Sequence, residues 1–381
     1  MRILVAPDSF KGSMSSLTAG KHMEAGILSV IPDARIQRVA LADGGEGTVD
    51  AFLSACGGEK VFHSITGPMG QPVRGYYGLL PDGRVVMEVA ASSSLTQVDQ
   101  EKRDPWIASS QGLGELLLLA LEKKPKEVII GLGGSATVDG GIGFLQKIGV
   151  KILDRNNCDV PSGGQGLAQV AAIDPSSMDP RVKDTKITVA SDVDNPLTGL
   201  DGAVRVFGPQ KGAGPKLLPL LEEGMEHYAT KLSDFVPDIQ KQSGGGAAGG
   251  LGAALLSICN TTLKSGFQIV SQAIRLEEKI SQSDLVLTGE GKIDSQTLSG
   301  KAPSGVACLG RQHGTPVIAF AGMVETGAGE LKQKGMTAVY PIVNAPMTEQ
   351  EAIQRGGELL EQAVQSFFQG AMAIGKSKPD S

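Results

Sequence analysis

The chain has 381 residues, more than one ordinary hydrophobic core accommodates, so its length favours two domains. With 41% hydrophobic and 20% charged residues it has a globular composition, and its net charge of −6 argues against a general nucleic-acid-binding surface. The four cysteines are far apart and form no CxxC pair, which argues against a disulfide or zinc framework. Because no apolar run could span a membrane and the N-terminus resembles a β-strand, not a signal peptide, we expect a cytoplasmic protein.

Strands and helices alternate at both ends of the chain. The N-terminal part predicts strands at 2–6, 36–41 and 61–65, a helix from Ser15 or Ser16 to about Val30, and a helix through Phe52. The C-terminal part predicts strands at 285–287, 316–320 and 338–342, helices near 304–313 and 326–334, and a long final helix after Thr348. Such alternation is typical of parallel sheets with helices on both faces.

The middle of the chain has a different pattern. Two predicted strands, 73–79 and 84–89, flank a Pro81-Asp-Gly turn and indicate a hairpin. We therefore predict two α/β domains: a discontinuous Rossmann-like domain formed by 1–65 and 282–381, and an inserted mixed α/β domain formed by 66–281. The cleft between the two domains is the expected position of the active site.

Glycine-rich segments with charged residues recur where strands are predicted to end. They are PDSFKGS (7–13), ADGGEGT (42–48), GLGGSATVDGG (131–141), SDVDNPL (191–197) and DLVLTGEGKIDSQTLSGKAP (284–303). In the last, we expect a loop after the strand 285–287 that holds Glu290, Lys292, Asp294 and Lys301. Open α/β sheets bind ligands at such loops, and glycine backbone beside acidic and basic side chains suits a phosphorylated, metal-bound ligand.

Two other interpretations remain open at this level. Gly131, Gly133 and Ala136 fit the G-x-G-x-x-A pattern, and Asp154 follows at about the 20-residue spacing of a ribose-binding acid, which favours an NAD-dependent 2-hydroxyacid oxidoreductase. A non-catalytic binder of small anions is the second alternative. A literal Walker A match at 370–377 is rejected, because a helix and not a strand is predicted before it.

Seven motifs of this chain resemble, in the same order, those of the bacterial type-1 glycerate kinase (glycerate 2-kinase) family. Besides those above they include FGPQKGA (207–213) and GGGAAGGLG (244–252). The resemblance implies transfer of the γ-phosphoryl group of ATP to D-glycerate with Mg²⁺, usually giving 2-phosphoglycerate. It implies D-glycerate and ATP as the ligands, with neither nucleic acid nor membrane as a partner, and it leaves a homo-oligomer open.

The acidic candidates on these motifs would act on the acceptor hydroxyl or on the metal. We assign Asp192 as general base or Mg²⁺ ligand, with Asp43 as a second metal ligand and Asp294 in the same acidic cluster. Glu290 would orient a lysine or a metal-bound water.

The remaining candidates would bind phosphate or carboxylate oxygens. Three lysines would do so through their charge: Lys11, Lys211 and Lys301. The backbone N–H groups of Gly133, Gly134 and Ser135 would hold phosphate oxygens. Because FGPQKGA is too polar for a core, we expect Lys211 outside the core.

Overall fold

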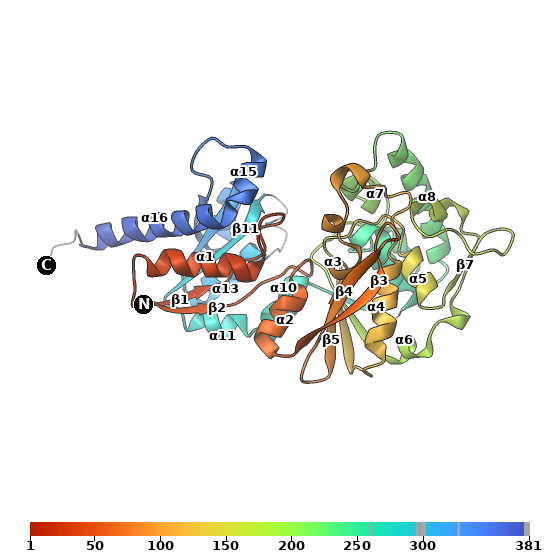
Figure 1. Cartoon of the computed structure of the whole chain (residues 1–381), viewed down its shortest axis with the longest axis horizontal. Coiled ribbons are helices and arrows are strands. Elements are labelled where there is room, and N and C mark those ends of the chain that lie inside the picture. The colour runs from red at the N-terminus through yellow and green to blue at the C-terminus, as the bar shows by residue number, and fades with distance from the viewer. Residues whose placement is uncertain (260, 295–296, 298–301, 326–327, 377–381) are drawn as a thin grey trace. The chain divides into compact units, whose positions relative to one another are not determined.

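The structure, a computed structural model, describes residues 1–259, 261–294, 297, 302–325 and 328–376 (Figure 1). The chain divides into two compact units. Unit 1 consists of Met1–Asp43 and Phe267–Ser381, and unit 2 of Gly44–Gly266. Each unit has its own sheet with helices packed on it, which confirms the predicted α/β fold class.

Unit 1 contains a parallel sheet with the strand order β13-β12-β11-β1-β2. The strands are β1 (Arg2–Val5), β2 (Arg35–Arg38), β11 (Leu285–Ile293), β12 (Val317–Val324) and β13 (Met336–Pro341). From β1 the chain continues to β2 on one side, while β11 lies on the other side. The strand order therefore reverses between β1 and β11, and open α/β sheets bind ligands at the carboxyl ends of such a pair.

Of the helices of unit 1, α1 and α16 contribute buried apolar side chains to the same core as the strands of this sheet. They are α1 (Ser16–Leu28), α10 (Gly266–Ala273), α11 (Leu276–Ser281), α13 (Ala302–His313), α14 (Ala328–Gln333), α15 (Glu349–Gln354) and α16 (Gly356–Lys376). Ser15 caps α1, since its hydroxyl accepts a hydrogen bond from Thr18 N–H. Helices α1 and α16 lie side by side (Figure 1), and Gly26 permits this approach, because a Cβ there would lie 2.6 Å from the Glu361 carbonyl oxygen.

Unit 2 contains a mixed sheet with the order β10-β9-β6-β5-β4-β3. The strands β10 (Thr262–Lys264), β9 (Lys186–Ala190), β6 (Glu127–Gly131) and β5 (Arg84–Glu88) are parallel. The strands β4 (Pro72–Leu79) and β3 (Glu59–Thr66) continue the sheet as antiparallel neighbours. The hairpin predicted around Pro81 is confirmed. A separate antiparallel pair consists of β7 (Lys151–Leu153) and β8 (Ala172–Asp174).

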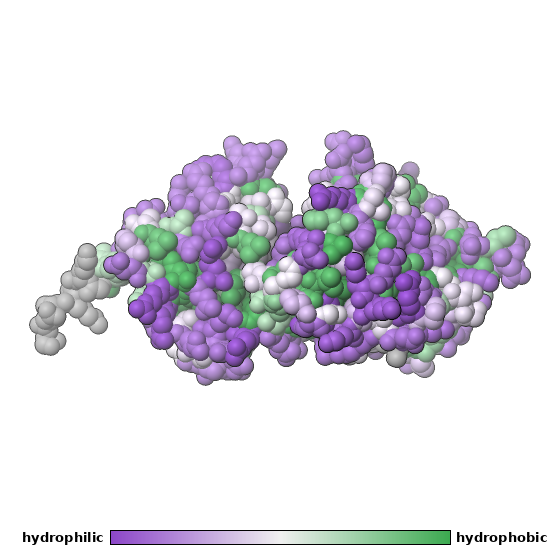
Figure 2. All heavy atoms as spheres, turned by 60° about the horizontal axis from the view of Figure 1, so that its bottom comes forward, coloured by the Kyte–Doolittle hydropathy of each residue, from purple (hydrophilic) through white to green (hydrophobic). Residues whose placement is uncertain are grey.

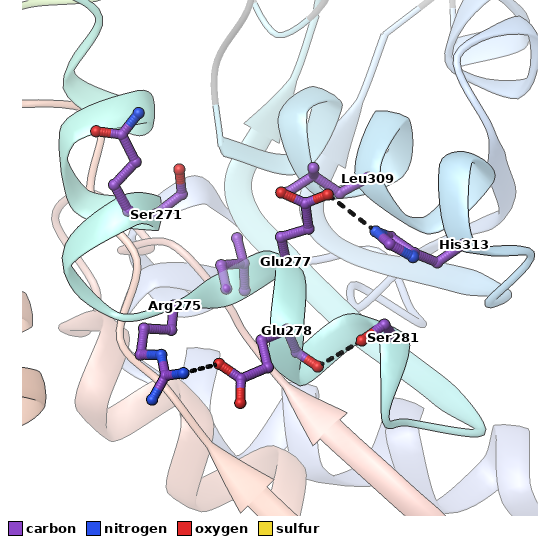
Figure 3. A pocket seen from close by; sticks show the side chains of 9 residues that line it. Ser271, Arg275, Glu277, Glu278, Ser281, Leu309 and His313 are labelled. Carbon is purple, nitrogen blue, oxygen red and sulfur yellow. Dashed lines mark hydrogen bonds and ion pairs between the residues drawn. The ribbon is translucent and has the colours of Figure 1, made fainter.

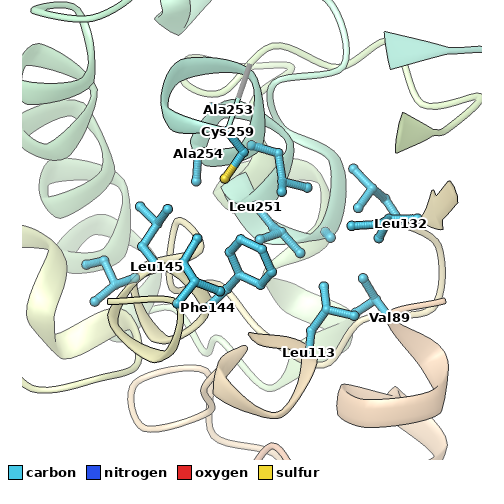
Figure 4. Close-up of a cluster of buried hydrophobic side chains, with 14 of the residues drawn as sticks. Val89, Leu113, Leu132, Phe144, Leu145, Leu251, Ala253, Ala254 and Cys259 are labelled. Carbon is cyan, nitrogen blue, oxygen red and sulfur yellow. The ribbon is translucent and has the colours of Figure 1, made fainter. Parts of the chain in front are cut away.

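The helices of unit 2 surround a large hydrophobic core, part of which is drawn in Figure 4. Phe144 and Leu251 are fully buried within it. The α-helices are α2 (Thr48–Cys56), α3 (Ala90–Ser93), α4 (Gln111–Leu121), α5 (Ile142–Lys147), α6 (Pro180–Asp184), α7 (Ala203–Phe207), α8 (Leu217–Leu232) and α9 (Leu251–Ile258). Short 3-10 turns are η1 (Leu95–Gln97), η2 (Gln100–Lys102), η3 (Gly164–Gln169), η4 (Pro175–Ser177), η5 (Pro209–Lys211), η6 (Ile239–Lys241) and η7 (Ala247–Gly250).

The unit boundaries differ from those expected from the sequence. The division falls at 43/44 and 266/267, and not at 65/66 and 281/282. The cause at the first boundary is β3, which pairs with β4 along its whole length and so belongs to the sheet of unit 2. At the second boundary, α10 and α11 lie in unit 1. The strand expected at 285–287 is also longer, because β11 continues to Ile293 and carries Glu290 and Lys292.

One face of the molecule carries mainly hydrophilic residues. Figure 2 shows hydrophilic residues over most of the visible face, interrupted by smaller hydrophobic areas. Within the described residues, no helix combines the length and the apolar character that crossing a bilayer requires.

Candidate active site

Three carboxylates follow or lie on neighbouring strands of unit 1, towards their carboxyl ends. Asp8 follows β1, Asp43 follows β2, and Glu290 lies on β11. The Asp8 N–H donates to the carbonyl of Gly289 at 2.8 Å, which fixes the segment after β1 against β11. Asp8 and Glu290 therefore flank the position where the strand order reverses, which is where this class of sheet binds ligands.

The carboxylates of this group repel one another. Asp8 is only 4% exposed, and burial together with the nearby Asp43 and Glu290 carboxylates raises its pKa well above the ordinary value. Two groups oppose this shift: the Ser9 N–H, which donates to Asp8 Oδ1 at 2.6 Å, and Lys11. The exposed Lys11 Nζ also lies 3.9 Å from Asp43 Oδ2. A cation that approached these carboxylates would relieve their repulsion.

Glu290 and Asp294 are connected through Thr297. The Thr297 hydroxyl donates to Glu290 Oε1 at 2.6 Å, and its backbone N–H donates to Asp294 Oδ1 at 3.3 Å. Lys292 lies on the same strand and pairs with Glu325 at 2.7 Å and with Asp294 at 3.7 Å. Thr297 thus links Glu290 to Asp294, which was expected in one cluster with Asp192 and Asp43, and Lys301 lies outside the described residues.

In unit 2, three backbone segments converge at the carboxyl ends of β6 and β9. Gly133 N–H donates to the Gly44 carbonyl at 3.1 Å, and Leu132 N–H donates to the Ala190 carbonyl at 3.1 Å. The approach is close enough that a Cβ on Gly133 would overlap the Cα of Gly45. Glycine is required here by space, and the N–H of Gly133 already has an acceptor. The expected role of this N–H in holding a phosphate oxygen is therefore not supported.

Acidic side chains already occupy two helix N-termini near these loops. Glu88 accepts hydrogen bonds from Val49 N–H at 3.0 Å and from Tyr76 Oη at 2.8 Å, at the start of α2. Asp139 accepts from Gly141 N–H at 3.1 Å and from Gly143 N–H at 3.2 Å, at the start of α5. Burial raises the pKa of both carboxyl groups. These N-terminal N–H groups are consequently used within the protein.

The dinucleotide-binding interpretation does not fit this geometry. A bound pyrophosphate needs a helix that opens directly at the glycine-rich turn, with N–H groups available at its N-terminus. Here α5 begins only at Ile142, and Asp139 accepts hydrogen bonds at its start. The expected ribose ligand, Asp154, is exposed and accepts hydrogen bonds from Asn156 and Cys158 in its own turn. The NAD-dependent alternative therefore lacks its binding site.

Gly134 and Ser135 are adjacent in the GLGGSAT loop, and Ser135 is only 5% exposed. Gly134 is exposed, with φ of 79°. Within the described residues, no acceptor of the N–H groups of Gly134 or Ser135 is found. Behind them lies Lys211, whose Nζ donates to Ser135 Oγ and to the Thr137 carbonyl, both at 2.8 Å. Lys211 is 4% exposed, so the expectation that it lies outside the core was wrong.

Asp192 follows β9 in the SDVDNPL segment. The Ser265 hydroxyl donates to its Oδ1 at 2.6 Å, whereas the exposed Asp194 accepts a hydrogen bond from Ser243 at 3.2 Å. The contact with Ser265 holds the Asp192 carboxylate in a defined orientation. Ser265 follows β10, the strand beside β9, and only the sheet pairing brings the two residues together.

Two further features of unit 1 do not make a catalytic site. The Walker A match begins within α16, at Gly370, and has no strand before it, while its last residue, Ser377, lies outside the described residues.

A surface cavity of 510 Å³ borders α10, α11 and α13 (Figure 3). Its charged residues pair with each other, His313 with Glu277 at 3.1 Å and Arg275 with Glu278 at 2.5 Å.

The sequence interpretation missed Asp8, Thr297 and Ser265. Asp8 lies in PDSFKGS, a segment that was selected for Lys11 alone, and its position directly after the first strand was an available signal. Thr297 also lies in a selected segment. Ser265 lies in none, and its contact with Asp192 follows from strand pairing across 73 residues of sequence.

Crowded carboxylates lie at the strand ends of one unit and glycine backbone at those of the other, which are features by which α/β enzymes bind phosphorylated ligands. A model of the Glycerate kinase family matches residues 3–371. The chain is 42% identical to glycerate kinase of Bacillus subtilis, covering 96% of this chain and 97% of the relative. It is 44% identical to glycerate 2-kinase of Escherichia coli, covering 93% of each.

A solved structure agrees with these relatives. The crystal structure of a putative glycerate kinase 2 from Salmonella typhimurium LT2 matches 99% of both chains with a TM-score of 0.80 at 41% identity. The chain belongs to the glycerate kinase family. It is a phosphotransferase that phosphorylates glycerate on an alcohol group.

Proposed function

We propose that this enzyme transfers the γ-phosphoryl group of ATP to D-glycerate with the help of Mg²⁺ and gives 2-phosphoglycerate. The observation that carries the proposal is the crowding of Asp8, Asp43 and Glu290 at the reversal of strand order in unit 1. Phosphoryl transfer depends mainly on positioning and on the neutralisation of charge, and a carboxylate group of this kind supplies a place for the neutralising cation.

The residues present fit Mg²⁺. This ion is usually held by one or two carboxylates, and phosphate oxygens and waters complete its coordination. In the described part of the chain, no set of three or more metal-ligating side chains has the geometry of a complete protein site. We assign Asp8 and Asp43 as the ligands in unit 1, with Asp192 as the candidate in unit 2. The bound ion would neutralise charge on the phosphates.

The other residues bind and orient the reactants. The N–H groups of Gly134 and Ser135 would bind phosphate oxygens. Asp192, oriented by Ser265, would accept the proton of the glycerate hydroxyl as that oxygen attacks the γ-phosphorus and ADP leaves. Lys11 and Lys301 would attract the negative charges of phosphate or carboxylate, and Glu290 and Asp294 would hold the acidic cluster in place.

The proposal is tested by ATP consumption with D-glycerate as acceptor. ADP should form only when D-glycerate and Mg²⁺ are both present. Phosphorus NMR of the product distinguishes phosphorylation at the 2-hydroxyl from phosphorylation at the 3-hydroxyl. The name of the Escherichia coli relative, glycerate 2-kinase, supports the 2-hydroxyl. A 3-phosphoglycerate signal would overturn the regiochemistry, and glycerate phosphorylation without ATP would overturn the proposed donor.

A further inference from the structure

Lys211 places a charged group in the interior of unit 2. It ends the 3-10 turn η5, and its Nζ makes the two 2.8 Å hydrogen bonds to Ser135 and Thr137. A lysine is almost never this deeply buried without a carboxylate partner in direct contact. Its two acceptors are instead a hydroxyl and a carbonyl, which are both neutral.

The position of Lys211 relative to the GLGGSAT loop explains what this charge can do. Ser135 contacts Lys211 through its side chain, and within the described residues no acceptor is found for its N–H or for that of the exposed Gly134. An anion held by these two N–H groups would lie on the outer side of the loop, with the ammonium group behind it. Because Lys211 is buried, its charge would be screened less by water than that of a surface lysine and would attract such an anion more strongly.

Asp139 is the charged group that acts on Lys211. The Asp139 carboxylate favours the charged form of Lys211, but it already accepts hydrogen bonds from Ser110, Gly141 and Gly143. Tyr228 of α8 lies near Asp139 and has a raised pKa, so it stays neutral. Arg103 donates to the Gln210 carbonyl at 3.1 Å, next to Lys211 in the chain.

Burial is the largest influence on Lys211 and lowers the pKa of its ammonium group to about 7. The group therefore exchanges its proton close to neutral pH. Without a ligand, a rise in pH of one or two units above this value would remove the charge behind the loop. An anion bound on the outer side would favour the charged form and return the proton to the lysine.

We propose that Lys211 is a positioning residue that couples protonation to phosphate binding, so that the enzyme takes up a proton from solvent when an ATP phosphate binds at Gly134 and Ser135. The inference rests on the proposed use of ATP at this loop. The coupling is reciprocal, because a proton that strengthens phosphate binding must itself be bound more tightly once the phosphate is present.

The test is calorimetric titration of the full-length enzyme with ATP and Mg²⁺, in the absence of glycerate. Measurements in buffers of different ionisation enthalpy give the number of protons exchanged. At about one pH unit above the pKa of Lys211, roughly 0.9 of the lysine is neutral, so we expect uptake approaching 0.9 proton per ATP bound. ATP affinity should also fall by up to about tenfold for each further pH unit.

Variants assign the proton to this residue. Lys211→Arg keeps a permanent charge and should abolish both the proton uptake and the fall in affinity above neutral pH. Lys211→Met removes the charge and should weaken ATP binding at all pH values, with no proton uptake. Lys216→Met is the matched control, since Lys216 is an exposed lysine five residues away, and it should behave as wild type.

The wild-type titration decides the inference even if both Lys211 variants fail to fold. ATP binding and glycerate-dependent turnover without proton uptake would overturn the role of Lys211 and leave the proposed function intact. Failure of ATP to bind at any pH would overturn the proposed function itself. Net proton release would point to Asp8, whose protonated carboxyl would lose its proton to an incoming cation, and would also overturn the inference.

Discussion

The Ser265 hydroxyl donates a 2.6 Å hydrogen bond to Oδ1 of Asp192, and it joins the ends of two adjacent parallel strands. The bond restricts rotation of the carboxylate and thereby determines where Oδ2 points. An aspartate held in this way at the carboxyl end of a strand is suited to accept a proton or to bind a cation in a fixed direction.

Replacing Asp192 with Asn removes the charge and keeps the shape, and an Asn Oδ1 can still accept the Ser265 hydrogen bond. We therefore expect the fold to survive, while turnover falls by about a hundredfold or more if the carboxylate is the base. Steady-state kinetics across a range of Mg²⁺ concentrations provide the measurement. If the variant needs a higher Mg²⁺ concentration for half-maximal turnover, the substitution has removed a metal ligand. If the required Mg²⁺ concentration is unchanged, it has removed a general base.

Asp194→Asn is the control for this variant, because Asp194 is exposed in the same segment. It should retain normal turnover. If Asp192→Asn also retained normal turnover at every Mg²⁺ concentration, Asp192 would serve only as a turn-forming residue.

Asp8→Asn should raise stability while it lowers activity. Burial and the neighbouring carboxylates raise the pKa of Asp8, so the folded state binds its proton more tightly than the unfolded chain does. The ionised form thus destabilises the folded enzyme, increasingly as pH rises from the ordinary value through the raised one. Asn removes this effect but also removes a proposed metal ligand.

Urea unfolding and turnover at neutral pH check both parts of this prediction. We expect a higher midpoint for Asp8→Asn together with a loss of turnover of about a hundredfold. A variant with normal turnover would remove Asp8 from the proposed site, and a lower midpoint would contradict the repulsion described above.

Gly133→Ala should destabilise unit 2. A Cβ at this position would overlap Gly45, and the overlap involves backbone atoms that cannot rotate away. We expect a loss of about 1–3 kcal/mol in the free energy of unfolding, as for other overpacked sites. Gly214→Ala is the matched control: nothing lies within 4 Å of its added Cβ. It should be neutral or stabilising by up to about 1 kcal/mol, and equal effects at both positions would argue against the clash.

Deleting residues from Gly375 onward should leave the KM for ATP unchanged. The deletion removes the GKS end of the Walker A match, which begins inside α16 and lacks the strand that a P-loop requires. A folded truncated enzyme with a greatly increased KM for ATP would show that this segment binds nucleotide.

Lys211 should make stability depend on pH above neutrality. Because its folded pKa is about 7 and its ordinary value is 10.5, the unfolded chain binds more protons between these limits. The free energy of unfolding should therefore rise with pH across this window, and the contribution should disappear as pH falls through 7. Lys211→Met lacks this contribution. The free energy of unfolding of the wild type minus that of the variant should therefore increase from pH 7 upward in urea titrations. A difference independent of pH would mean that Lys211 stays charged throughout.

Local patterns in the sequence determined much of the architecture. The alternation of apolar strands and amphipathic helices indicated the α/β class, and the order of the glycine-rich motifs indicated the glycerate kinase family, which the relatives confirm. The hairpin around Pro81 and the cap at Ser15 were also readable, because each depends on residues close together in the chain.

Long-range contacts determined the rest. The composition of residues 59–66 predicts a strand but does not indicate which sheet it joins. Only their antiparallel pairing with β4 places them in unit 2. Lys211 lies in a segment as polar as a surface loop, but its ammonium group finds acceptors in Ser135 and Thr137, which are more than 70 residues away. Asp8 acquires its raised pKa from burial and from the nearby Asp43 and Glu290 carboxylates. Burial and charge proximity depend on segments distant in sequence, so only the tertiary structure decided which polar residues are accessible and which are enclosed.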